Sequence, residues 1–419
     1  MNRLIAAFMI AVCLIPAVNA EASGPPELSA VSAILMDAES GRVLFEKNAH
    51  QERAIASITK LMTALLMIPA VSVKASSPPE LSAVSAVLMD AESGRVLFEQ
   101  NAHEKRAIAS VTKLMTALVA VESGRRMEET VTIRPEWTGI EGSSIYLRAG
   151  ETVTLETLLY GLLLNSGNDA AVAVASHCAG SVDAFVEQMN HRARSLGMEQ
   201  TNFTNPSGLS DDGHYSTAYD MALLAKACSK NDIVAKIMAT KCAVFGTRSF
   251  TNHNKLLWRY KGCIGMKTGF TEAAGRTLVS GARRNGRTLI AVTLNAPNDW
   301  NDHASLFDYG FEAFSHQTLR TGGEVICDMP VQGSLVRFVP VVSESGMSYP
   351  LADGEQIRQS IVLNCPLITP IEAGDCLGKM SFYLDETLIG EINLIAGKTV
   401  YSDRSKPRTV WEWLRESLI

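Results

Sequence analysis

The sequence predicts a mixed α/β (α+β) domain followed by a small all-β domain, and three observations support this. The chain has 419 residues, which is more than one average domain needs. Up to about residue 320, amphipathic helical stretches alternate with strand-like stretches. From there to about residue 397, short alternating runs are separated by turn residues, as is typical of an all-β domain.

The N-terminus has the features of a secretory signal peptide. Arg3 precedes an apolar run, and small residues lead to a cleavage site after Ala20, with Ala22 as the alternative. An uncleaved anchor is the competing interpretation, although the run is too short to span a bilayer by itself. We therefore expect residues 1–20 to be a signal peptide and the protein to be exported.

Composition narrows the class of function further. Hydrophobic residues make up 47% and charged residues 20% of the chain, as in ordinary globular proteins. The net charge of −6 gives no reason to expect a nucleic acid partner. Outside the predicted signal peptide the cysteine count is odd (8 − 1 = 7), so at least one thiol should be free or intermolecular.

A tandem repeat stands near the N-terminus. The heptapeptide at 56–62 recurs with one conservative change at 109–115, an offset of 110 − 57 = 53 residues. Two copies are too few for a solenoid, and a single fold has one place for such a strand-and-helix unit. We expect residues 21–77 to be an extra copy, either loosely attached or competing for that place.

Continuity of the following helix favours the second copy. After Lys113 the helical pattern runs on to Ser123-Gly124, a plausible C-terminal cap, whereas Pro69 ends the helix of the first copy. The complete mixed domain should therefore occupy residues 78–320 and the β-rich domain residues 321–405.

Individual elements follow from periodicity and turn residues. Arg284-Asn285-Gly286 is a strong hairpin signal between two apolar runs. We expect strands at 85–90, 95–99, 276–281 and 288–295, and helices at 155–164, 170–178, 182–196, 218–229 and 302–314. The tail at 406–419 is amphipathic, with Trp413 on its apolar face. It suits either a weak membrane-surface contact or docking on its own domain.

The first chemical motif is Ser110-x-x-Lys113 at the start of a predicted helix. A serine hydroxyl needs a base to become a good nucleophile, and this spacing puts the lysine one turn away. The lysine can be that base if burial or another cation lowers its pKa. The alternative is that Ser110 only caps a helix.

Two later motifs support the chemical interpretation. Ser166-Gly167-Asn168 follows an apolar helix, 166 − 110 = 56 residues after the first serine. Lys267-Thr268-Gly269 follows after another 267 − 166 = 101 residues and offers a cation and a hydroxyl to a carboxylate. A cation at Lys267 near Lys113 would lower the pKa of the latter by repulsion, and Gly269 would let a substrate backbone approach closely.

In this order and with their flanking residues, the three motifs resemble the low-molecular-mass penicillin-binding proteins, the serine-type D-alanyl-D-alanine carboxypeptidases. The resemblance covers roughly residues 80–320, and the β-rich region resembles the C-terminal domain of the same family. It implies a penicillin-binding/β-lactamase-like transpeptidase domain. The duplicated first copy departs from the family pattern.

The resemblance also implies a mechanism and its partners. Ser110 would attack a peptidoglycan stem peptide between its two terminal D-alanines during cell-wall maturation, and β-lactam antibiotics would acylate the same serine. The implied roles are nucleophile for Ser110, base for Lys113, proton relay for Ser166, amide orientation for Asn168, carboxylate binding for Lys267 and Thr268, and an oxyanion hole from the backbone N–H groups of Ser110 and Phe270. No metal or cofactor is implied, and the place of work is the extracytoplasmic cell envelope.

Three alternatives remain open at this point. A class A-like β-lactamase shares the fold and nucleophile, but we find no convincing glutamate-bearing loop between Asn168 and Lys267. A non-catalytic peptidoglycan-binding protein and an endopeptidase acting on cross-links are the others. We interpret the histidines at 177, 191, 214 and 303 as surface or loop residues, with His214 singled out because its loop matches the family.

Overall fold

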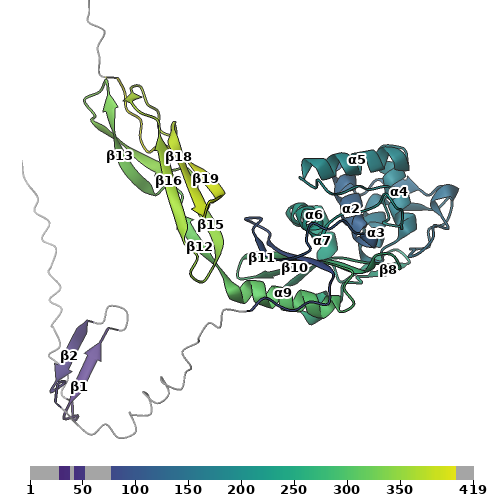
Figure 1. Cartoon of the computed structure of the whole chain (residues 1–419), viewed down its shortest axis with the longest axis horizontal. Helices are drawn as coiled ribbons and strands as arrows, with labels where there is room; N and C mark the ends of the chain where they lie inside the picture. The colour runs from purple at the N-terminus through teal and green to yellow at the C-terminus, as the bar shows by residue number, and fades with distance from the viewer. Residues whose placement is uncertain (1–27, 38–41, 52–76, 403–419) are drawn as a thin grey trace, which may run out of the picture. The chain divides into compact units, whose positions relative to one another are not determined.

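A computed structural model describes residues 28–37, 42–51 and 77–402 of the chain (Figure 1). By its contacts the chain divides into a first unit, residues 1–72, and a second unit, residues 73–419. The predicted signal peptide, Ser57 with its helix, and the C-terminal tail lie outside the described residues. None of the helices within the described ranges is long and apolar enough to cross a membrane.

The repeated sequence folds into the same hairpin in both units. In the first unit, β1 (Ala33–Met36) pairs with β2 (Val43–Lys47), and in the second, β3 (Ser85–Asp90) pairs with β4 (Val96–Gln100). The two registers are equivalent, down to an irregularity before the last pair of each hairpin. Their surroundings differ, since Leu35 is 57% exposed whereas its counterpart Leu88 is fully buried.

An antiparallel sheet forms the centre of the second unit. Its strand order is β4-β3-β11-β10-β9, where β9, β10 and β11 span Cys263–Thr271, Gly275–Arg284 and Arg287–Leu294. The predicted turn between β10 and β11 is present, with Asn285 and Gly286 both at positive φ. Because β3 pairs with β11, the β3–β4 hairpin at the start of this domain lies beside a strand from near its end.

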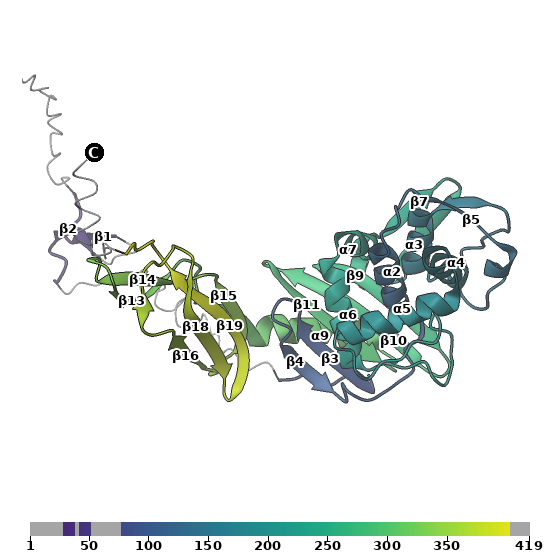
Figure 2. The ribbon, with the colours of Figure 1, turned by 90° about the horizontal axis from the view of Figure 1, so that it is seen from above.

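Helices cover both faces of this sheet (Figure 2). One side holds α2 (Lys113–Glu122), α3 (Leu155–Leu164), α4 (Asn168–Ala179), α5 (Val182–Ser195), α6 (Ala218–Lys230) and α7 (Asp232–Ala239). Their apolar side chains form one core with Val279 and Val292 of the sheet. On the other side α9 (Asp299–Ala313) packs Leu306 and Phe307 against Leu278 and Leu289.

Helix α2 is enclosed by the other elements over most of its length. All residues from Lys113 to Ala120 are buried, including the lysine. A charged side chain in such a position is costly unless its charge is removed or compensated. Burial of Lys113 is therefore a first sign that this end of the helix serves a chemical purpose.

Several short elements were not anticipated from sequence. They are η3 (Pro135–Trp137), the pairs β5 (Thr130–Thr132) with β6 (Thr152–Thr154) and β7 (Cys242–Phe245) with β8 (Arg248–Thr251), and the helices α7 and α8 (Leu256–Arg259). Apart from α7, which has eight residues, these elements have only three or four residues each. Such short elements give little periodicity, so sequence patterns detect them poorly.

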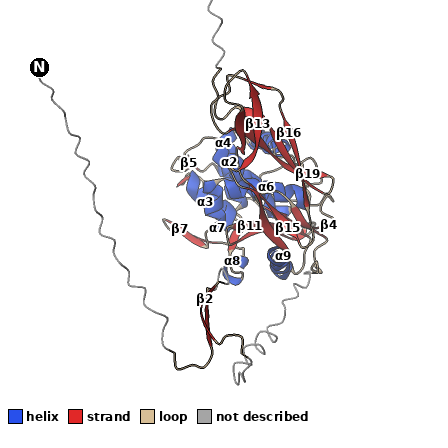
Figure 3. Ribbon diagram, turned by 90° about the vertical axis from the view of Figure 1, so that its left-hand side faces the viewer, coloured by secondary structure: helices blue, strands red, loops and turns tan. Residues whose placement is uncertain are grey.

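The C-terminal region is all-β, as predicted, and Figure 3 draws its strands in red, as it does the strands of the rest of the chain. β12 (Phe314–Arg320) pairs with β15 (Met347–Ala352). A six-stranded sheet has the order β16-β18-β19-β14-β13-β17, built from β13 (Val325–Gln332), β14 (Phe338–Ser343), β16 (Ile357–Leu363), β17 (Leu367–Ile368), β18 (Cys376–Leu384) and β19 (Thr387–Ala396). Its core is separate from that of the helical domain.

The polar side chains correct one expectation. His214 and His303 are buried, so the interpretation of all four histidines as surface or loop residues is wrong for His303 and incomplete for His214. Each of the two is held by hydroxyl groups. The seven described cysteines are all free thiols.

Candidate active site

Ser110 lies in a tight turn that leads into α2. The turn is the 3-10 element η2 (Ala109–Thr112), and the α-helix begins at Lys113. Ala109 has a φ of 51°, a left-handed conformation that non-glycine residues rarely adopt. The predicted helix start is thus a strained turn that presents the serine, and the Lys113 Nζ lies 2.9 Å from the Ser110 Oγ.

The surroundings of Lys113 favour its neutral form. Burial is the main cause that lowers its pKa, and the charge of Lys267 adds to it. The Nζ also lies 2.7 Å from the Asn168 Oδ1 and 2.5 Å from the Ser207 carbonyl oxygen, and both of these can only accept. A neutral amine has two N–H bonds for these oxygens, which leaves its lone pair directed at the Ser110 hydroxyl.

Lys267 is the second buried amine of the site. It is 1% exposed and donates to the Thr268 carbonyl oxygen at 2.8 Å. Burial lowers its pKa to about 7. The charge of Lys267 lowers the pKa of Lys113, as expected from sequence, although burial is the larger cause.

The second motif connects two helices. Ser166, with a φ of 62°, lies between α3 and α4, and Asn168 is the first residue of α4. Besides accepting from Lys113, Asn168 donates through Nδ2 to the Glu141 carbonyl oxygen at 2.6 Å and through its backbone N to that of Ser143 at 2.7 Å. Asn168 thereby ties the lysine to the loop that forms one wall of the cleft.

The third motif runs along the edge strand β9. A Cβ on Gly269 would lie 2.9 Å from the backbone nitrogen of Ser110 and would also collide with the Thr277 hydroxyl. The glycine is therefore required for contacts within the protein itself, in addition to the close substrate approach expected from sequence. This contact sets the β9 edge against the turn that carries Ser110.

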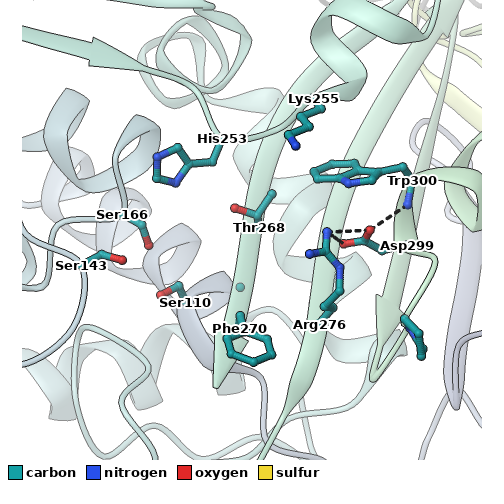
Figure 4. Close-up of a pocket in the computed structure, with 12 residues that line it drawn as sticks. Ser110, Ser143, Ser166, His253, Lys255, Thr268, Phe270, Arg276, Asp299 and Trp300 are labelled. Carbon is teal, nitrogen blue, oxygen red and sulfur yellow. Dashed lines mark hydrogen bonds and ion pairs between the residues drawn. The ribbon is translucent and has the colours of Figure 1, made fainter. Parts of the chain in front are cut away.

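The three motifs meet at a cleft of about 570 Å³ (Figure 4). Five of the eight predicted residues line it: Ser110, Ser166, Thr268, Gly269 and Phe270. The remaining three, Lys113, Asn168 and Lys267, are buried. Residues more than one hundred positions apart in sequence are thus brought to one place.

The sequence did not point to seven other residues that line the cleft: Ser143, His253, Lys255, Arg276, Pro297, Asp299 and Trp300. Arg276 makes two contacts of 2.8 Å with the Asp299 carboxylate and lies 5.5 Å from the centre of the Trp300 ring. Only the register of the β9–β10 hairpin, which pairs Arg276 with Phe270, indicates that Arg276 lies at the cleft. That register is visible only once the strands are placed.

This arrangement suits acyl transfer. It combines a hydroxyl with an adjacent neutral amine, a second hydroxyl, an edge strand for an extended peptide, and cationic side chains at the cleft. The group of charges would favour a substrate that carries a carboxylate.

Comparison with known proteins identifies relatives over nearly all of the described chain. The family model for D-alanyl-D-alanine carboxypeptidase, Peptidase_S11, matches residues 19–77 and 72–298, so that both copies of the repeat match it. The model for the C-terminal domain of penicillin-binding protein 5 matches residues 314–402.

Individual relatives agree with the family models. The chain is 32% identical over 324 residues to D-alanyl-D-alanine carboxypeptidase DacF of Bacillus subtilis, which covers 74% of this chain and 83% of the relative. It is 34% identical over 341 residues to DacA of Escherichia coli, covering 76% and 83% of the two chains. The crystal structure of penicillin-binding protein 5 from Haemophilus influenzae matches with a TM-score of 0.67 and 31% identity over 78% of this chain and 99% of that one.

Proposed function

Because the chain belongs to the D-alanyl-D-alanine carboxypeptidase family, we propose that it removes the terminal D-alanine of peptidoglycan stem peptides through an acyl-enzyme on Ser110. The observation that carries this assignment is the contact between the Ser110 hydroxyl and the buried Lys113 amine at the cleft. Neither the β-lactamase nor the non-catalytic alternative is favoured by the family matches.

The first step is attack on the carbonyl between the two D-alanines. Neutral Lys113 takes the Ser110 proton as the Oγ–C bond forms, and the backbone N–H groups of Ser110 and Phe270 stabilise the oxyanion. Ser166 passes a proton to the departing D-alanine, and water then hydrolyses the ester. Charge near the leaving group comes from Lys267, whose pKa of about 7 leaves it partly protonated at neutral pH.

The substrate is held along β9. Asn168 orients the amide of the scissile dipeptide, and Lys267 with Thr268 binds its terminal carboxylate. Gly269 keeps the strand edge close to Ser110. A penicillin carries both the amide and the carboxylate that these groups recognise, and so is expected to acylate Ser110.

The choice of Ser110 over Ser57 rests on the quality of fit. At three fully buried sites of the second copy the first copy carries a larger side chain: Ile34 for Val87, Ile58 for Val111 and Met67 for Ala120. In a close-packed core each added group forces neighbours to move. The second copy is therefore the better occupant of the catalytic fold.

We extend the proposal to location. The signal-like residues 1–20 would direct export, the domains would span residues 78–320 and 321–405, and the tail at 406–419 would give at most a weak contact with the membrane surface. This placement agrees with the cell-wall role of the family.

The deciding experiment is to label the mature protein with a tagged penicillin and to locate the label by peptide mass spectrometry. Label on Ser110, together with D-alanine release from a peptide ending in D-Ala-D-Ala, is the expected result. Rapid turnover of the penicillin would instead indicate a β-lactamase. A folded sample without label and without D-alanine release would contradict the assignment.

A further inference from the structure

Buried His214 contacts the turn Ala109–Thr112, which carries Ser110. His214 is 4% exposed, and its Nε2 lies 2.8 Å from the Thr112 hydroxyl. The Thr112 hydroxyl in turn donates to the Ala109 carbonyl oxygen at 2.8 Å. Both Thr112 and Ala109 are immediate neighbours of the proposed base and nucleophile, so this short chain of hydrogen bonds ends at the reacting groups.

The partners of the ring decide its tautomer. The Nδ1 lies 3.1 Å from the backbone nitrogen of Thr204, which can only donate, so Nδ1 must be an acceptor. The ring proton is therefore on Nε2, which donates to Thr112. The groups that face the ring agree with a neutral imidazole, since burial and Lys113 lower the pKa of His214 to about 4 against the opposing effect of Asp211.

The peptide between Ala109 and Ser110 passes the effect on to the site. In a planar trans peptide the carbonyl oxygen and the following N–H point in opposite directions. A hydrogen bond that fixes the Ala109 oxygen therefore also fixes the direction of the Ser110 N–H, which is the proposed oxyanion donor. The positive φ of Ala109 makes this plane a strained one that needs such support.

We propose that His214 is a positioning residue that, through Thr112 and the Ala109 carbonyl, aims the Ser110 N–H at the oxyanion of the tetrahedral intermediate. The inference rests on the proposed function, because it assumes that Ser110 is the nucleophile. His214 itself touches neither substrate nor the reacting atoms. Its neutral Nε2–H tautomer, set by the Thr204 N–H, is the form that performs the task.

Two substitutions separate the two hydrogen bonds of the ring. His214→Gln can still donate toward Thr112 but lacks the Nδ1-like acceptor, whereas His214→Asn keeps an acceptor near Thr204 and cannot reach Thr112. Thr112→Val removes the relay hydroxyl with almost no change of shape. His303→Gln is the matched control, because His303 is also buried between two hydroxyls, those of Ser280 and Thr293, but on the α9 side of the sheet.

The readouts are kcat and KM for a peptide ending in D-Ala-D-Ala, and affinity for a D-alanine boronic acid that forms a tetrahedral adduct. Outright loss of an oxyanion donor costs about 10²- to 10³-fold in kcat, so a misdirected donor should cost about 10- to 100-fold. We expect this loss in Thr112→Val and His214→Asn, with unchanged KM and an equal loss of boronate affinity. His214→Gln and His303→Gln should stay within about threefold of the wild type.

Other results would overturn the inference. Full kcat in Thr112→Val and His214→Asn would show that the relay does nothing. If His303→Gln lost kcat to the same extent, or if the loss of kcat matched a lower unfolding midpoint, His214 would have a structural role only. A shift of the acidic limb of the pH profile would show that His214 acts on Lys113 instead. If Thr112→Val does not fold, the two His214 variants still decide. Failure of the proposed function is distinct, because wild-type Ser110 would then take no penicillin label.

Discussion

Removal of the Ser110 hydroxyl tests whether the upstream copy can replace the downstream one. The Ser110→Ala variant still contains the Ser57-x-x-Lys60 motif, and over residues 28–65 that copy differs from residues 81–118 only at positions 34, 47, 51, 52 and 58. If the two copies exchanged freely, Ser57 would take over as nucleophile. We expect that it does not.

The structure sets the size of the preference. Val87, Val111 and Ala120 are each fully buried, and the first copy would insert a larger side chain at all three sites. Such overpacking costs about 1–3 kcal/mol per site, or roughly 3–9 kcal/mol in all. The first copy also places Pro69 where Glu122 ends α2, and Glu52 where Lys105 lies 4.7 Å from the Tyr215 ring. Even at about 3 kcal/mol, the first copy would occupy the catalytic fold in less than about 1% of molecules.

The assay is the initial rate of labelling by a tagged penicillin, with the labelled serine located by mass spectrometry. We expect Ser110→Ala to label Ser57 at least about 100-fold more slowly than the wild type labels Ser110. A variant lacking residues 66–118 is the control, because it joins Leu65 to Val119 and so retains Ala120 and Glu122. This variant should fold and label Ser57. Labelling of Ser57 in Ser110→Ala at a rate near that of the wild type would refute the packing argument.

Three further predictions concern the site itself. The value of kcat/KM should rise with pH as Lys113 loses its proton, and fall at higher pH as Lys267, with its pKa of about 7, loses the charge that attracts the substrate carboxylate. The Lys267→Arg variant should keep that charge and remove the alkaline fall, which is checked by measuring D-alanine release across pH. Gly208→Ala should lower both the unfolding midpoint and acylation, because Gly208 has a φ of 82° and a Cβ there would collide with the Ala109 carbonyl; equal stability in the variant would contradict this. Arg276→Ala should destabilise by about 1–3 kcal/mol, since it leaves the Asp299 carboxylate buried without its cation, and Arg276→Ala with Asp299→Asn should recover part of the loss in thermal unfolding.

The sequence alone determined the elements whose cause is local. Helix α3 and strand β3 have the predicted bounds because their periodicity and their boundaries are encoded within ten or so residues. The Asn285-Gly286 turn is likewise a local preference for positive φ. Each of the three motifs is a run of three or four residues and is weak by itself, but their order and flanking residues made them identifiable together.

Only the tertiary structure decided the surroundings of those motifs. The pKa of Lys113 is low because the side chain is buried among residues from distant segments, with Asn168, Ser207 and Lys267 around its amine, and no local pattern records that burial. Arg276 and His253 line the cleft because of strand register and loop placement. His214 is a buried partner of Thr112 and not a solvent-facing loop residue. The same holds for the repeat, in which nearly identical sequences form the same hairpin, yet Leu35 is exposed and Leu88 buried. Burial and proximity are set by the partners that pack against a residue, and those partners lie far away in the chain.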